Sequence, residues 1–214
     1  MTGTRNIGRR SAFWPALVAL AVSGCATTTS QRHAPPARID IQEQVGFTIV
    51  EEGRISDIVR ADYDAALRYL QQGDLQQGIV LLEAIVAQAP ELAAPHIDLG
   101  MAHHRAGDLE AAAASLRQAV TVNPSHPIAH NELGIVYRKL ARFSEAKQSY
   151  EAALGIYPGY HYARRNLAIL CDLYLADLDC ALNNYEAYMT TVPADEEVSM
   201  WIADIRYRMD QGVR

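Results

Sequence analysis

The chain has 214 residues, half of them hydrophobic, and a formal net charge of −6 at neutral pH. This length and apolar content suffice for a sizeable buried core. The acidic balance argues against nucleic acid or an anionic lipid surface as the main partner.

The first 24 residues have the layout of a secretory signal peptide. Arg5, Arg9 and Arg10 precede an apolar run over residues 12–22, which is shorter than the roughly 20 residues that a transmembrane helix needs. We expect residues 1–24 to be removed, which leaves a chain with a net charge of about −9 because three arginines are lost. The adjacent Arg9 and Arg10 leave export by the twin-arginine route as an alternative.

The apolar run leads into Val22-Ser23-Gly24-Cys25, which resembles the lipobox of bacterial lipoproteins. The resemblance implies that Cys25 becomes the first residue of the mature protein and carries the lipid anchor. Ala26 follows it, in place of the aspartate that favours retention in the inner membrane. The resemblance therefore implies a lipoprotein of the outer membrane that faces the periplasm. A plain signal peptide with an incidental cysteine is the alternative.

Two segments separate this cysteine from the regular part of the chain. Residues 25–38 are rich in threonine, serine, proline and alanine, a composition that predicts a flexible linker. Residues 39–58 form an N-terminal extension, in which Phe47-Thr48-Ile49-Val50 predicts a short extended piece because it is aromatic and β-branched. Whether this piece packs on the array or binds a partner stays open. Ser56 is expected to cap the first helix.

Four prolines recur at steps of 34, 34 and 35 residues: Pro90, Pro124, Pro158 and Pro193. A period of this length is typical of stacked helix hairpins, whose surfaces serve mainly in binding. With each proline third from the end of a unit, the array spans 59–195. Its units are 59–92, 93–126, 127–160 and 161–195.

Small residues recur at two fixed positions of each unit, and a large residue follows the second. The first small position holds Ala66, Gly100, Gly134 and Ala168, the second Gly78, Ala112, Ala146 and Ala181, and the large position Leu82, Leu116, Tyr150 and Tyr185. This order predicts two antiparallel helices that approach closely. Gly73-Asp74 and Gly107-Asp108 suit tight turns between them, and each proline ends the second helix.

These positions resemble the tetratricopeptide repeat (TPR) family over about residues 59–195. The resemblance implies an all-α superhelix of helix hairpins, with three clear repeats and one degenerate repeat. The last unit departs from the pattern, since it has an extra residue, no glycine in its turn, and the bulky Tyr188 where a small residue is expected. The extra residue is expected between Cys171 and Cys180.

Residues 196–214 are expected to form a terminal capping helix and tail. Val198, Trp201, Ile202, Ile205 and Met209 recur at helical spacing. The acidic start at 195–197 and the basic residues near the end suit the helix dipole. Trp201 is expected in the core.

Cys171 and Cys180 are expected on opposite helices of the last hairpin. In an oxidising compartment a disulfide between them is one reading, and two small buried apolar residues are the other. This pair alone does not make a structural zinc site, which needs four ligands.

Histidines offer the main hint of chemistry. His96 and His130 occupy the same position in adjacent units, and a metal site would form if His96 and His103 faced His130. The position of His96 and His130 usually holds an aromatic packing residue in the TPR family, and His103 aligns with Tyr69 and Tyr137 of the neighbouring units, so packing is favoured. With no phosphate-binding glycine loop and no nucleophile elbow, we expect no catalysis, no cofactor and no bound metal.

The resemblance implies that the first helix of each unit lines a groove for a partner. The apolar floor comprises Tyr63, Leu67, Ile97, Met101, Ile128, Ile135 and Ile169. One edge carries Asp64, Asp98, Glu132 and Asn166, the other His104, Arg105, Arg138, Lys139 and Asp172, and Asn131 and Arg165 complete the set. Such a groove suits an extended or helical peptide. The alternative is that several of these residues contact the neighbouring repeat instead.

The expected function is that of a lipid-anchored adaptor that binds a protein or peptide partner in the cell envelope. Similar proteins include pilotin-like lipoproteins of type IV pili, TPR lipoproteins tied to peptidoglycan enzymes, and proteins assigned to TonB-type systems. The last unit, from Asn166 to Tyr174 with Trp201 to Asp204, is most similar to the TonB-type group. A metal or small-ligand carrier and a purely structural protein are the alternatives.

Overall fold

The computed structural model describes residues 38–42, 46–50 and 56–212. The predicted signal peptide over 1–24, the predicted lipidation site at Cys25 and most of the predicted linker lie outside these residues. Nine helices are described: α1 Asp57–Gln72, α2 Leu75–Gln88, α3 Ala93–Ala106, α4 Leu109–Val122, α5 Pro127–Lys139, α6 Phe143–Ile156, α7 His161–Leu173, α8 Leu178–Thr191 and α9 Glu196–Asp210.

The described residues before the helical array form a two-stranded antiparallel hairpin, which begins at Arg38, the last residue of the predicted linker. Strand β1 spans Arg38–Gln42 and strand β2 spans Gly46–Val50, with Ile39 opposite Ile49. The predicted extended segment at 47–50 is confirmed by β2, whereas its partner strand was not predicted. The helical array remains all-α, and the hairpin is an addition to it.

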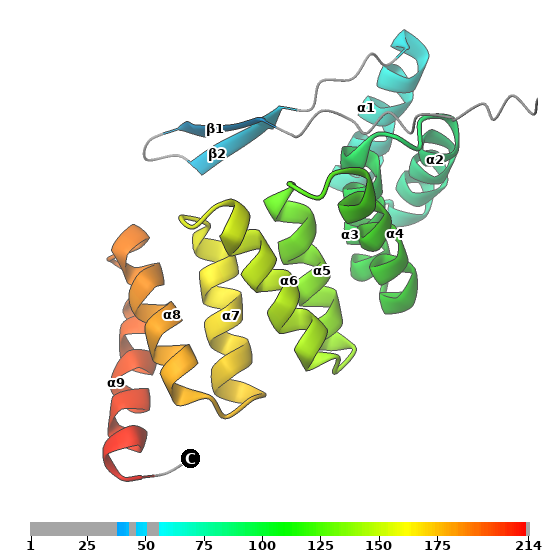
Figure 1. The fold of residues 1–214 in the computed structure, drawn as a ribbon. Helices are drawn as coiled ribbons and strands as arrows, with labels where there is room; N and C mark the ends of the chain where they lie inside the picture. Colours follow the sequence, from blue (N-terminus) through cyan, green and yellow to red (C-terminus); the bar gives the residue numbers. More distant parts are fainter. Residues whose placement is uncertain (1–37, 43–45, 51–55, 213–214) are drawn as a thin grey trace, which may run out of the picture. The chain divides into compact units, whose positions relative to one another are not determined.

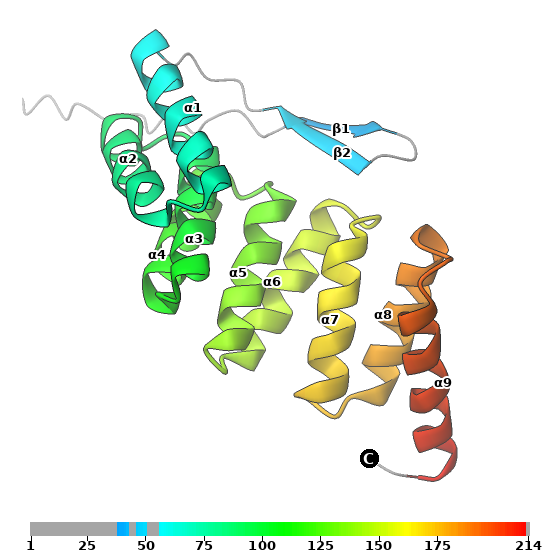
Figure 2. The ribbon, with the colours of Figure 1, turned by 180° about the vertical axis from the view of Figure 1, so that it is seen from behind.

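Each predicted unit contains one pair of helices, and the pairs follow one another in chain order (Figures 1 and 2). The two helices of a pair pack together, and the second helix of each pair packs on the first helix of the next. In addition α3 contacts α5, and α5 contacts α7. Helix α1 begins two residues before the predicted start of its unit, because Ser56 caps it by accepting a hydrogen bond from the Val59 amide at 3.2 Å.

The small positions permit the close helix contacts that the pattern predicted. A Cβ atom added to Gly134 would lie 2.6 Å from Cε1 of Tyr150, and one added to Gly100 would lie 2.5 Å from Cγ of Leu116. Both large side chains are fully buried. The buried apolar residues form two clusters that meet in α3, one extending from Val59 to Ala102 and the other from Ile97 to Ile205.

Each turn between the two helices of a hairpin contains one residue in the left-handed backbone conformation. Gly73 and Gly107 have φ angles of 85° and 88°. Asp74 and Asp108 follow them and cap α2 and α4 by accepting bonds from backbone amides at 3.1 Å and 3.0 Å. Glycine adopts this conformation without a steric penalty.

Alanines take the same left-handed position in the last two units, with φ angles of 56° at Ala141 and 53° at Ala176. A non-glycine residue there costs about 1 kcal/mol. We therefore expect Ala141→Gly to raise the free energy of unfolding by about 0.5 kcal/mol, measured by urea denaturation. The exposed helical Ala114→Gly should lower it by about 1 kcal/mol, and an equal loss at both sites would contradict this account.

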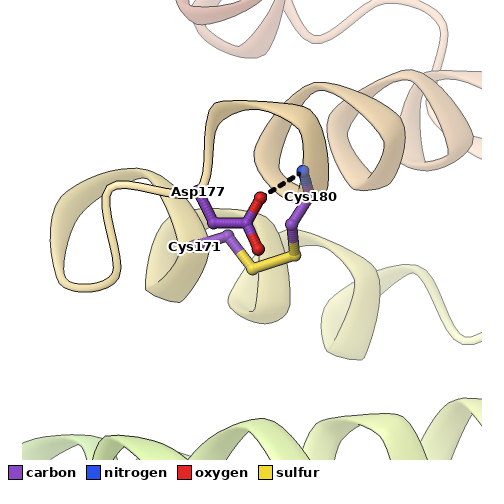
Figure 3. Close-up of side chains that lie close together, drawn as sticks. All are labelled: Cys171, Asp177 and Cys180. Atoms are coloured by element: carbon purple, nitrogen blue, oxygen red, sulfur yellow. Dashed lines mark hydrogen bonds between the residues drawn. A yellow bond between two sulfur atoms is a disulfide. The ribbon is translucent and has the colours of Figure 1, made fainter. Parts of the chain in front are cut away.

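The extra residue of the last unit lies in the turn between α7 and α8, as predicted. This turn spans 174–177 and ends at Asp177, which accepts a bond from the Cys180 amide at 3.0 Å. A disulfide joins Cys171 of α7 to Cys180 of α8 beside this carboxylate (Figure 3). The last hairpin is thus tied by a covalent bond across its longer turn.

Helix α9 closes the array in the way that the sequence predicted. Val198, Ile202 and Ile205 are buried, and Asp195 caps the helix by accepting a bond from the Val198 amide at 3.1 Å. Trp201 is half-buried, with its ring 5.5 Å from that of Tyr185.

The unexpected bulk of Tyr188 also has a role at this end. Its side chain is buried, and its hydroxyl donates to a carboxylate oxygen of Asp195 at 2.7 Å. The tyrosine therefore links the end of α8 to the start of α9.

Candidate partner-binding groove

The predicted floor of the groove lies on α1, α3, α5 and α7, which are the first helices of the four units. Met101 is 37% exposed. The other floor residues with partial exposure are Tyr63, Leu67, Ile128, Ile135 and Ile169. These apolar side chains are accessible enough to contact a partner and buried enough to be held in place.

Two predicted groove residues are inaccessible, and for them the prediction was wrong. Ile97 is only 5% exposed and belongs to the larger core cluster. Asn131 is only 2% exposed. Its side chain accepts a hydrogen bond from Asn166 at 3.0 Å and donates one to Glu132 at 3.0 Å. Both side chains serve contacts within the array, which is the alternative that the sequence left open.

A pocket of about 190 Å³ lies between α1 and α3. Its lining comprises Leu67, Leu70, Gln71, Asp98, Met101, Ala102 and Arg105. The Arg105 guanidinium donates to the Leu70 carbonyl at 3.3 Å, and Asp98 accepts a bond from the Tyr63 hydroxyl. The pocket therefore has apolar walls with a carboxylate and a guanidinium among its lining groups.

The acidic edge contains two largely buried carboxylates at the same position of successive units, Asp98 in α3 and Glu132 in α5. Burial raises the pKa of both carboxyls, while single hydrogen bonds from Tyr63 and Asn131 oppose the shift. Within the described ranges neither carboxylate takes part in an ion pair. The acidic edge thus contains two partly desolvated carboxylates, and no cationic side chain of the described residues pairs with them.

The basic edge lies in the last turn of α3 and α5. It comprises His104, Arg105, Arg138 and Lys139. The Arg138 guanidinium lies 5.7 Å from the centre of the Tyr174 ring. Burial, aided by the charges of Lys139 and Arg138, lowers the pKa of His104. Six to seven residues of helix separate these bases from the acids, which is about 10 Å along the axis.

At the α7 end of the groove, two residues that were predicted to face the partner contact α9 instead. Arg165 pairs with Glu197 at 3.0 Å, and its guanidinium lies 5.2 Å from the centre of the Trp201 ring. Asp172 pairs with Arg208 at 2.5 Å. These two groove residues of α7 hold the terminal helix, so the accessible groove is formed mainly by α1, α3 and α5.

The repeated histidines have a structural role. The Nε2 atom of His96 donates to the Pro90 carbonyl at 3.2 Å, and that of His130 donates to the Pro124 carbonyl at 2.9 Å. In the next unit Arg164 contacts the Pro158 carbonyl in the same way, at 3.4 Å. Each side chain thus satisfies the carbonyl at the preceding inter-unit turn.

Potential metal ligands gather elsewhere. In the part of the chain that the structure describes, the one group of three suitable ligands is Cys171, Asp177 and Cys180, two of which are joined in the disulfide (Figure 3). No such group there contains a histidine. The hypothesis of a metal carrier that uses the repeat histidines therefore gains no support.

The largely buried Glu132 on α5 should lower the stability of the fold at neutral pH. Because the pKa of Glu132 is raised on folding, its contribution to stability is present below the unfolded pKa and is lost as pH rises through the folded value. We expect Glu132→Gln to raise the free energy of unfolding at pH 7 by about 1 kcal/mol, with a smaller gain at pH 4.

Urea denaturation at the two pH values measures this difference. Glu151→Gln, on the exposed face of α6, is the control and should change stability little at either pH. Equal effects of the Glu132 variant at pH 4 and pH 7 would show that its carboxyl is not desolvated.

Comparisons with known proteins support the fold. Two overlapping stretches, 63–121 and 97–161, match the family model of the tetratricopeptide repeat. No curated protein matches the sequence significantly. Among the described helices, none has the length and apolar character required to cross a membrane.

Several solved structures have the same arrangement of helices. MamA from Desulfovibrio magneticus RS-1 superimposes with a TM-score of 0.66 at 18% identity, over 73% of this chain and 88% of that one. The thermophilic TPR protein TTC0263 of Thermus thermophilus gives 0.58 at 26% identity, over 70% and 81%. PilF of Pseudomonas aeruginosa gives 0.64 at 22% identity, over 72% and 69%. The chain therefore has the all-α tetratricopeptide repeat fold, which is typical of protein-interaction modules.

Proposed function

We propose that this protein is a non-catalytic adaptor that a lipid on Cys25 anchors to the outer membrane, and that its groove binds a protein or peptide partner in the periplasm. The adaptor acts in the assembly or regulation of a cell-envelope complex, such as pilus, TonB-type or peptidoglycan machinery. The observation that carries the proposal is a groove with a partly exposed apolar floor between acidic and basic edges. Apolar contacts supply affinity there, and the charged edges set orientation.

Two further observations support an envelope location. The lipobox-like segment ends at Cys25, and a disulfide joins Cys171 to Cys180. Disulfides persist in oxidising compartments such as the periplasm and are rare in the cytosol.

Affinity purification from membranes in mild detergent tests the adaptor function. The wild-type chain should recover a specific envelope protein, and Met101→Lys should abolish the recovery because it places a charge on the groove floor. Val80→Lys is the matched control, since Val80 is 47% exposed on α2, outside the groove residues. Equal recovery by both variants would contradict a binding role of the groove.

Labelling with radioactive palmitate tests the anchor. The wild-type chain should incorporate the label and sediment with outer membranes, whereas Cys25→Ser should do neither. Incorporation that persists in the variant would refute lipidation at this residue.

A further inference from the structure

The acidic edge of the groove carries two largely buried carboxylates, Asp98 and Glu132, which have no ion-pair partner among the described residues. Among the described residues, Asp98 and Glu132 each receive one side-chain hydrogen bond, from the neutral groups of Tyr63 and Asn131. A largely buried carboxylate without a cation is costly, because a single neutral donor replaces only part of its hydration. The described array contains two such groups in register on neighbouring helices, since α3 contacts α5.

The two arginines of the same two helices contact other groups than these acids. Arg105 donates to the Leu70 carbonyl, and Arg138 lies over the Tyr174 ring. Lys139 is exposed at the end of α5, seven residues beyond Glu132, which is about 10 Å along the axis. The protein's own cations on these helices are therefore held away from the two acids.

Apolar groove residues flank both carboxylates. Met101 lies one turn beyond Asp98, and Ile128 and Ile135 lie one turn before and after Glu132. Side chains three or four residues apart share a helix face. The pocket between α1 and α3 brings Asp98 together with Leu67 and Met101. A complementary ligand thus presents a cation next to aliphatic surface.

We propose that the groove selects a partner segment that carries lysine or arginine flanked by aliphatic side chains, with its cations paired to Asp98 and Glu132. This inference rests on the proposed function of the groove and names the chemistry of its occupant. Packed helices lie about 8–10 Å apart, and an extended chain rises about 3.3 Å per residue. A segment that crosses α3 and α5 therefore places two basic residues about three positions apart. Charge-assisted hydrogen bonds then replace the hydration that folding removed from the two acids.

Selection from a library of random twelve-residue peptides displayed on phage tests the inference, with the immobilised full chain as bait. We expect lysine and arginine to be enriched at least threefold over the unselected library, about three positions apart and next to aliphatic residues. Asp98→Asn with Glu132→Gln should lose this enrichment, because the variant retains both hydrogen-bond acceptors and removes the charges. Glu151→Gln, which removes an exposed acid of α6 outside the groove, should retain it.

Binding of one selected peptide, measured by fluorescence anisotropy, gives the quantitative test. Changing its basic residues to glutamine should weaken binding to the wild-type chain at least tenfold and binding to the double variant less than twofold.

The outcomes separate the inference from the function on which it rests. Peptides that depend on Met101 but show no basic enrichment would overturn the inference and leave the groove as a binding site. Peptides whose binding survives Met101→Lys, or a selection without any binder, would contradict the function of the groove and the inference together.

Discussion

Replacing Tyr150 with alanine is expected to lower the free energy of unfolding by about 3–5 kcal/mol, the usual cost of removing a large buried aromatic side chain. Its side chain is fully buried, and its ring fills the space that Gly134 leaves between α5 and α6. Burial also raises the pKa of Tyr150 to about 12, so its hydroxyl stays neutral at physiological pH. Collapse of the two helices onto the cavity would recover only part of the loss.

The Tyr150→Ala substitution should also make unfolding of the array less cooperative. Tyr150 lies in the larger core cluster, while the first hairpin belongs to the smaller one. Because repeats interact mainly with their neighbours, weakening the third unit should let the two ends of the array unfold separately. Urea denaturation followed by circular dichroism should show a broader transition at lower urea. Tyr162→Ala, at a side chain 60% exposed on α7, is the control and should change stability by less than about 0.5 kcal/mol.

Removing the disulfide by Cys171→Ala with Cys180→Ala is expected to cost about 2–3 kcal/mol. The bond closes a loop between residues nine positions apart, and the chain-entropy model gives roughly this value for so short a loop. Wild-type protein in excess dithiol reductant should lose a similar amount of stability. This comparison separates the effect of the disulfide bond from the effect of replacing the two cysteine side chains. Equal stability of oxidised and reduced wild-type protein would show that the bond does not constrain the last hairpin.

The regularity of the array could be predicted from the sequence because it depends on contacts between residues close in the chain. The spacing of Pro90, Pro124 and Pro158 follows from the length of a helix pair. The small residues opposite Leu116 and Tyr150 follow from the distance between the helices of a pair. Strand β1 was missed because residues 38–42 adjoin a stretch whose composition predicts a linker.

The groove was predicted only in part. A position within the repeat indicates which way a side chain points, but it does not give the depth at which the next helix covers it. Ile97 and Asn131 are buried for this reason. The engagement of Arg165 and Asp172 by α9 depends on side chains 32 and 36 residues further along the chain, and the repeat pattern gave no indication of these pairs.

The central claim is that the partner binds on the first helices of the hairpins. Site-specific photo-crosslinking in living cells tests it most directly, with a photoreactive phenylalanine placed at Met101 in the groove or at Val80 on α2. Both side chains are partly exposed. We predict a discrete crosslinked protein from position 101 and none from position 80. A crosslinked partner from position 80 with none from position 101 would contradict the account.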